Sequence, residues 1–399
     1  MSLYSAENER RIRSQAVVRE WTASGLLDPS QGAALEAELR VDVRRTNVFL
    51  RAGLALFTVL IVAASVLLTI EAFDLNWALP VAGVTAVAAM VCFGLAHYLV
   101  ERHRFYRFGV EEALAIGFVV LMAVSAGVLI DAQEVLQLAE RPLVAGLVAG
   151  LVVAAAGGLV VYRRFGYVYA AIGAIACVAA VPFWLGITET MQHAAAAAAL
   201  AAAFGFARAR RMRYRDEYPG DDYALMQAAA AAGLYWTLNL WFVEAQLNGP
   251  LYGFVSPRVG APFYWFTYVM IWALPAAGLY MAVRDKDRPL LDVSLVMALV
   301  TCLTNKAYLG WTRHEWDPIL LGVVLIAAAV GVRRWLSAGA NGQRHGFTPA
   351  RILSKDTGAM TMLGTASAGF HPDAPSYPES GGSGFDGGRS GGGGASGSY

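Results

Sequence analysis

The chain has 399 residues, of which 57% are hydrophobic and only 15% are charged. Soluble globular domains carry about 25% charged residues, so this composition indicates a protein that lies mainly within a lipid bilayer. It excludes a disordered, collagen-like or disulfide-scaffold chain for most of the length. The formal net charge of +1 argues against a nucleic-acid partner, which requires a basic surface.

The first 47 residues are mostly polar and predict two short helices, at 5–23 and 29–46. Gly25 suits the end of the first helix. The run at 28–31 (Asp-Pro-Ser-Gln) supplies an N-cap, a proline at the first helical position and a capping-box partner. A hairpin of this size cannot hold a hydrophobic core alone. We therefore expect 1–47 to dock on a neighbouring part of the protein, on the membrane surface or on a second copy.

The pattern Trp-x-x-x-Gly-Leu-Leu-Asp-Pro, which starts at Trp21, is followed directly by apolar segments. In this it resembles bacterial multi-pass inner-membrane proteins of unknown function that begin with a short N-terminal helical hairpin. The resemblance covers about the first 70 residues and implies a multi-helix bundle after the hairpin. It implies no activity, cofactor or site residue, because none is assigned in that family.

Apolar segments long enough to cross a membrane dominate the middle of the chain. A bilayer core about 30 Å thick requires roughly 20 apolar residues in a helix. Ten segments qualify, and the sixth is the weakest because it is almost pure alanine. They lie at about 52–70, 77–100, 113–130, 142–162, 166–187, 191–207, 223–245, 261–283, 290–304 and 316–332. The sequence thus predicts an all-α polytopic membrane protein with a ten-helix transmembrane bundle over 48–335.

The cations predict the orientation of the bundle. Of the 31 Lys and Arg residues, only Arg141, Arg258, Lys306 and Arg313 lie on the side away from the termini, which leaves 27 on the other side. Positively charged loops stay in the cytoplasm, so both termini are expected there. A polar segment precedes the first span, which predicts an uncleaved targeting signal. Arginine supplies all but three of the cations, as in high-GC bacterial genes, so we expect the bacterial inner membrane.

The end of the chain, 336–399, is rich in Gly, Ser and Pro. Its last 20 residues include 10 glycines, a composition that cannot bury enough apolar area to fold. We expect a flexible cytoplasmic tail. Like the hairpin at 1–47, this tail is also a candidate binding segment for a cytoplasmic protein. The sequence does not predict an oligomeric state.

The sequence lacks the motifs that are typical of soluble enzymes. None of the three lysines follows the glycine pattern of a Walker loop, and the six histidines show no zinc-ligand spacing. The three cysteines fall in separate apolar segments, so none is expected to pair. We predict no catalytic residue, no metal and no cofactor.

Polar side chains inside the spans are costly in lipid and therefore indicate a possible site. The seventh and ninth spans carry such residues toward the outer surface, where they meet an aromatic and charged loop before the tenth span. We call this set the predicted polar cluster. Its members are Asn239, Trp241, Glu244, Tyr264, Trp265, Thr301, Asn305, Lys306, Arg313, His314, Glu315 and Asp317.

Two interpretations of the predicted polar cluster stay open. In the first, aromatic walls and charged groups form a pocket that faces the periplasm and binds a ligand. In the second, Trp and Tyr anchor the helices at the bilayer interface, Asp317 and Pro318 begin the tenth span, and Glu244 or Glu315 pairs with Lys306 or Arg313.

Three functions follow from these features. The first is a non-enzymatic inner-membrane protein that senses, scaffolds or supports envelope functions through its cytoplasmic ends. The second is a secondary transporter for a small polar or aromatic solute, with an outward-facing site on spans seven to ten and prolines Pro182 and Pro275 interrupting two spans. The third is a membrane enzyme for a lipid-linked substrate, with Glu244, Asp317 or His314 as acid or base.

Overall fold

A computed structural model describes residues 6–23, 25–44, 46, 48–75, 77–132, 142–214, 219–241, 259–311, 314 and 316–339. These residues form twelve α-helices, one short 3-10 helix and no strand, which confirms the all-helical prediction. In chain order they are α1 (Ala6–Ala23), α2 (Pro29–Glu38), α3 (Val48–Ala72), α4 (Ala78–His103), α5 (Val110–Ala132), α6 (Pro142–Phe165), α7 (Val168–Ala180), η1 (Val181–Trp184), α8 (Glu189–Arg213), α9 (Pro219–Leu238), α11 (Ala261–Asp285), α12 (Arg288–Tyr308) and α13 (Asp317–Ser337).

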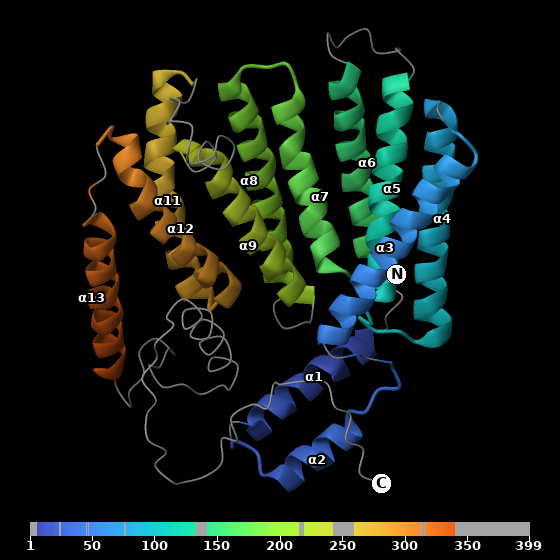
Figure 1. The fold of residues 1–399 in the computed structure, drawn as a ribbon. Helices are drawn as coiled ribbons and strands as arrows, with labels where there is room; N and C mark the ends of the chain where they lie inside the picture. The colour runs from blue at the N-terminus through green and yellow to red at the C-terminus, as the bar shows by residue number, and fades with distance from the viewer. Residues whose placement is uncertain are drawn as a thin grey trace, which may run out of the picture.

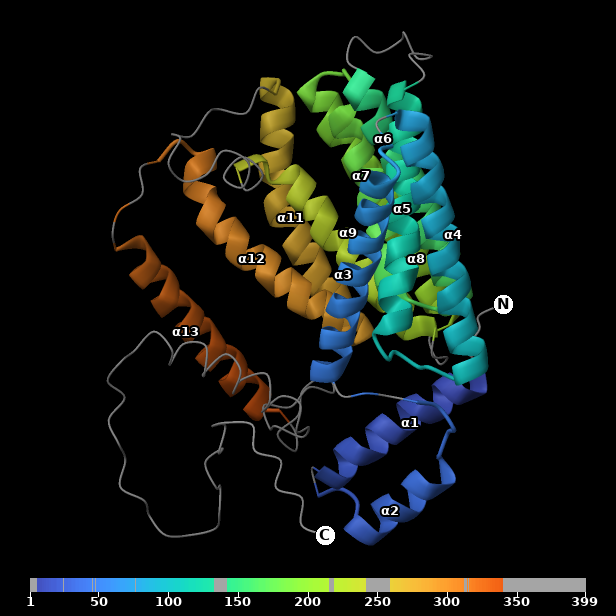
Figure 2. The same cartoon turned by 45° about the vertical axis from the view of Figure 1, so that its right-hand side comes forward.

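Helices α1 and α2 form the expected hairpin, which lies beneath one end of the bundle (Figures 1 and 2). We call this end the hairpin face. Gly25 follows α1 with a φ of 75°, a conformation that glycine adopts without strain. The amide of Asp28 donates a hydrogen bond to Oε1 of Gln31 (3.2 Å), the backward half of the predicted capping box.

Helix α2 ends at Glu38, eight residues before the predicted position. The chain after it pairs instead with the connection between α4 and α5. The amide of Arg44 donates to the carbonyl of Arg104 (3.0 Å), and the amide of Tyr106 donates to the carbonyl of Arg44 (3.1 Å). These bonds hold the segment extended beside the bundle, because a helix there would use the same backbone groups internally.

Successive long helices run alternately away from the hairpin face and back toward it (Figure 1). Seven of them are long and apolar enough to cross a membrane: α3, α4, α5, α6, α11, α12 and α13. The chain is therefore a multi-pass membrane protein. The other three predicted segments coincide with α7 plus η1, with α8 and with α9, which are shorter or more polar. The predicted tail lies outside the described residues beyond Gly339.

The bundle consists of two groups of helices that meet at α7. Helices α3, α4, α5 and α6 pack on one another, as do α8, α9, α11 and α12, and α7 touches α6, α8 and α9. The approach of α6 to α7 is close, since a Cβ at Gly158 would lie 2.7 Å from the carbonyl oxygen of Ala170. Helix α13 has no buried residue and stands apart from α12 in both views (Figures 1 and 2).

Candidate functional site

The predicted polar cluster lies at the end of the bundle opposite the hairpin face, on α9, α11, α12 and the start of α13. Nine of its twelve residues are described, while Glu244, Arg313 and Glu315 lie outside the described residues. The described members fall into three sets of contacts: one around Asn239, one around Tyr264 and one around Lys306.

Asn239 is fully buried where α9 ends. Its Nδ2 donates to the hydroxyl of Tyr235 (2.9 Å) and to Oγ1 of Thr304 (3.1 Å). The Tyr235 hydroxyl also lies 2.8 Å from Oγ1 of Thr301, which donates to the carbonyl of Ile271 on α11 (2.7 Å). These hydrogen bonds join α9, α11 and α12 without lipid contact, and they use both hydrogens of the amide.

Tyr308 bridges a break in the helical backbone next to Asn239. Its hydroxyl accepts a hydrogen bond from the amide of Leu240 (3.0 Å) and donates to the carbonyl of Leu238 (3.2 Å). The phenol thus satisfies two backbone groups that the end of α9 leaves without helical partners. Tyr308 is not a member of the predicted polar cluster, because residue type alone does not reveal a contact with backbone.

Trp241 and Tyr264 meet beside this break. Nε1 of Trp241 donates to the hydroxyl of Tyr264 (3.0 Å), which donates to the carbonyl of Tyr308 (2.9 Å). Asn305 accepts a hydrogen bond from the hydroxyl of Tyr268 (3.0 Å), whereas Trp265 is about half exposed. Aromatic side chains therefore pack this end of α11 and α12 against each other.

Lys306 is paired with Asp317 at the start of α13, at 2.6 and 2.7 Å to its two carboxylate oxygens. The same carboxylate accepts a hydrogen bond from the amide of His314 (3.0 Å), and Nζ of Lys306 lies 5.7 Å from the ring centre of Trp316. This pairing occupies both charged groups. It leaves Asp317 poorly suited to act as a free acid or base in the membrane-enzyme hypothesis.

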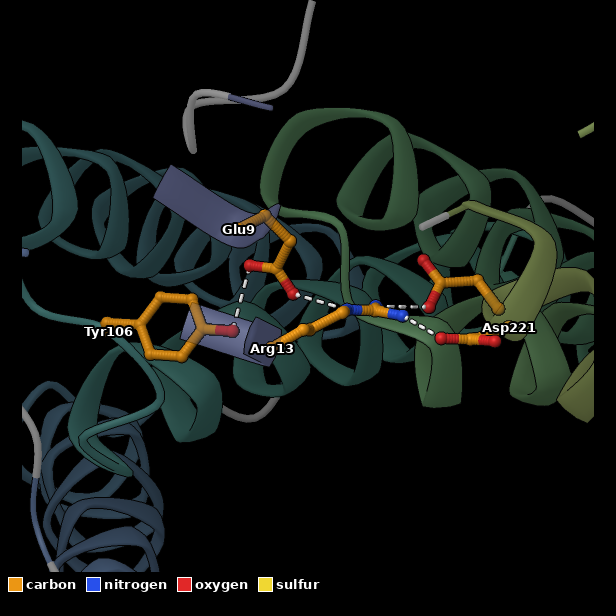
Figure 3. A network of polar contacts seen from close by, with 5 residues as sticks. Glu9, Arg13, Tyr106 and Asp221 are labelled. Carbon is orange, nitrogen blue, oxygen red and sulfur yellow. Dashed lines mark hydrogen bonds and ion pairs between the residues drawn. The ribbon is translucent and has the colours of Figure 1, made fainter. Parts of the chain in front are cut away.

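A second polar site, which the sequence did not reveal, joins the hairpin to the bundle (Figure 3). Tyr106 donates from its hydroxyl to Oε2 of Glu9 on α1 (2.8 Å). Arg13, one turn further along α1, donates to Asp221 (2.6 Å) and to Asp222 (3.0 Å) on α9, and its Nε lies 3.4 Å from Glu9. We call these five residues the docking cluster.

Burial sets the electrostatics of the docking cluster. Glu9 and Asp222 are each only 8% exposed. Burial raises the pKa of Asp222 above its usual value, although Arg13 acts in the opposite direction, and burial raises the pKa of Tyr106 to about 12. Burial acts to lower the pKa of Arg13, but the hydrogen bond and the carboxylate charges outweigh it and raise that pKa.

A pocket of about 310 Å³ opens beside the docking cluster. Glu9 of α1 forms one wall, and the connection between α4 and α5 and the ends of α6, α8 and α9 form the others. We call it the hairpin pocket. Its charged and tyrosine lining consists of Glu9, Tyr106, Arg107, Tyr162, Arg163, Tyr214, Asp222 and Tyr223.

Further ion pairs at the hairpin face connect helices within the bundle. Arg51 of α3 contacts both carboxylate oxygens of Glu112 on α5, with 2.6 Å from Nε to Oε2. Arg208 of α8 lies 2.9 Å from Asp285, and the neighbouring Arg211 pairs with Asp287. Arginines that the sequence assigned to topology therefore also neutralise carboxylates at helix ends.

Among the described residues, no group of three His, Cys, Asp or Glu side chains converges. Comparison of the chain with protein-family models, with curated proteins and with solved structures finds no match. The two sites therefore have to be interpreted from their own geometry.

Proposed function

We propose that the protein is a bacterial inner-membrane protein with ten spans, in which α7 with η1, α8 and α9 cross the bilayer beside the seven apolar helices. The hairpin face is cytoplasmic, as are both termini. Two observations support this arrangement: the 27 cations on the side of the termini, and the alternating directions of all ten helices (Figure 1).

Thiol accessibility in intact cells tests the orientation. A cysteine at Ser30, on α2, should react with a membrane-impermeant reagent only after permeabilisation. A cysteine at Phe73, which is 72% exposed in the connection beyond α3, should react in intact cells. The opposite pattern would overturn the orientation.

The protein acts, in this proposal, as a sensor or scaffold whose hairpin presents or withholds a surface to a cytoplasmic protein. The observation that carries it is the docking cluster, since Glu9 fixes α1 to the connection between α4 and α5 and Arg13 fixes it to the start of α9. A hairpin held by a few polar contacts can exchange between docked and free states. Trp21 and Leu26, which do not belong to the cluster, are exposed apolar residues suited to a protein contact.

Crosslinking in cells tests this function. A photoreactive residue at Leu26 should capture a defined cytoplasmic protein, whereas the same residue at Phe73 should not. Arg13→Gln, which frees the hairpin, should change the yield of the crosslinked product formed from position 26. Equal products from both positions, or a yield that is insensitive to Arg13, would contradict the proposal.

The second candidate is a secondary transporter for a small polar or aromatic solute, with its site in the predicted polar cluster. It is favoured by the interruption of α9 at Asn239, because transporters place broken helices at their solute sites. Uptake into proteoliposomes that Asn239→Ala abolishes, with the fold retained, would support it. The satisfied hydrogen bonds around Asn239 favour a packing role, so we place this function second.

A further inference from the structure

The hairpin pocket is bordered by two arginines, Arg107 and Arg163, that pair with no carboxylate within the described part of the chain. Arg13 contacts both carboxylates of the pocket, Glu9 and Asp222. Arg107 and Arg163 have no ion pair with any carboxylate of the described residues, and Arg107 acts on Asp222 only at longer range. Two guanidinium groups therefore border one cavity, and no described carboxylate pairs with either of them.

Arg107 is held in an unusual backbone conformation, with a φ of 50°. Glycine adopts this left-handed region far more easily than arginine. The guanidinium carbon lies 5.6 Å from the ring centre of Tyr106, a residue of the docking cluster. Residues held in this region often occur at functional sites, and Arg107 lines the cavity.

The remaining walls are rich in tyrosine. Tyr214 and Tyr223 stack with ring centres 6.1 Å apart, and Tyr106 and Tyr162 lie at the same cavity. Tyrosines provide flat apolar surface together with hydroxyl groups that bond to oxygen-rich ligands. A volume of about 310 Å³ is at the lower end for small-molecule sites.

We infer that the hairpin pocket binds a phosphate ester, with the phosphate between Arg107 and Arg163 and the organic part against the tyrosines. Arginine is the preferred partner of phosphate, because its planar fork donates two parallel hydrogen bonds. The ester is either the headgroup of an anionic phospholipid, since the pocket lies where the long helices end, or a soluble phosphate ester.

Occupancy of the pocket is coupled to the hairpin, an inference that rests on the proposed function. Glu9 closes one wall only while α1 is docked through Tyr106 and Arg13. A ligand that requires this wall binds the docked state more tightly and thus shifts the hairpin toward it. The phosphate ester is, in this scheme, the signal that withdraws the hairpin from its cytoplasmic partner.

The test uses the full chain in nanodiscs and measures thermal unfolding together with hydrogen exchange of residues 6–23. One series adds inorganic phosphate or adenosine monophosphate to discs of phosphatidylcholine. The other replaces part of that lipid with phosphatidylglycerol. Stabilisation with slower exchange by adenosine monophosphate in the first series identifies a soluble ester, and the same effects in the second series alone identify a headgroup.

Matched variants assign the effect to the pocket. Arg163 is exposed, so Arg163→Gln should keep the fold while weakening binding at least tenfold, and Arg107→Gln should do the same. The neighbouring Arg164 contacts His97 instead (3.3 Å), so Arg164→Gln and the exposed Arg102→Gln should bind normally. No stabilisation in either series, or equal binding by Arg163→Gln and Arg164→Gln, would overturn the inference.

Failure of the proposed function gives a different result. If exchange of residues 6–23 without ligand is as fast in the wild type as in Arg13→Gln, the hairpin is not docked and the proposed function fails. If the hairpin is docked but the ligand leaves its exchange unchanged, the coupling inferred here fails alone.

Discussion

The hydroxyl of Tyr106 lies 2.8 Å from a carboxylate oxygen of Glu9, although 97 residues separate them in the chain. This bond and the adjacent pairs of Arg13 turn a hairpin too small to fold alone into a fixed part of the bundle. Of the docking partners expected for 1–47, the structure thus shows a neighbouring part of the same chain.

Loss of Arg13 should release the hairpin. Arg13→Gln leaves Asp222 buried without its cation, which should cost about 1–3 kcal/mol and accelerate hydrogen exchange across 6–23. Arg10→Gln is the matched control, because Arg10 is an exposed residue of the same helix. Equal exchange in the two variants would show that the docking cluster does not hold α1.

Acidification should reveal the buried carboxylate of Asp222. Burial raises the pKa of Asp222 in the folded state. At a pH between the unfolded pKa and this higher pKa, the folded state therefore binds more protons than the unfolded state. This group therefore adds stability as the pH falls through the native pKa, with the full gain reached below the unfolded pKa. Thermal unfolding in detergent against pH should show this component in the wild type. Asp222→Asn, with no group to titrate, should lack it, and identical profiles would contradict the assignment.

Removal of one hydroxyl should weaken the junction of α9 and α12. Tyr308→Phe leaves the amide of Leu240 and the carbonyl of Leu238 without their partner, at a cost of about 1–3 kcal/mol. Tyr280→Phe serves as the control, because Tyr280 on α11 is 66% exposed. Thermal unfolding should separate the two, and similar melting temperatures would mean that the backbone break has other support.

A methyl group at Gly109 should disturb the start of α5. Gly109 has a φ of 108°, and a Cβ there would overlap the carbonyl oxygen of Arg51. Gly109→Ala should lose about 1–3 kcal/mol through backbone conformation alone, and more through the overlap. Gly53→Ala, where nothing lies within 4 Å of the added carbon, should cost little. Chemical denaturation measures the free energy of unfolding of both variants, and equal losses in Gly109→Ala and Gly53→Ala would contradict the prediction.

Local sequence signals predicted the local structure. Gly25 and Asp28 marked the helix boundaries of the hairpin because turn and cap chemistry depend on adjacent residues. Apolar length predicted the long helices in the same way. Helix α7 illustrates the limit: it ends at Ala180, and a separate 3-10 turn that contains Pro182 begins at Val181.

The sites were harder to predict because their contacts are distant in the chain. Lys306 pairs with Asp317, 11 residues further along the chain. The sequence suggested Glu244 or Glu315 as the partner of this lysine and an N-cap role for Asp317. Arg13 pairs with Asp222, which lies 209 residues away in the chain. No period or spacing connects such residues, since the packing of whole helices brings them together.

The docking cluster also has a mechanical consequence. Tyr106 belongs to the group of helices α3 to α6, whereas Asp222 belongs to the group that contains α8, α9, α11 and α12. Helix α1 contacts both groups, because Glu9 binds Tyr106 and Arg13 binds Asp222 (Figure 3). Helix α1 therefore connects the two groups of helices across α7. A movement of one group relative to the other must lengthen or break the contact of Glu9 or the contact of Arg13.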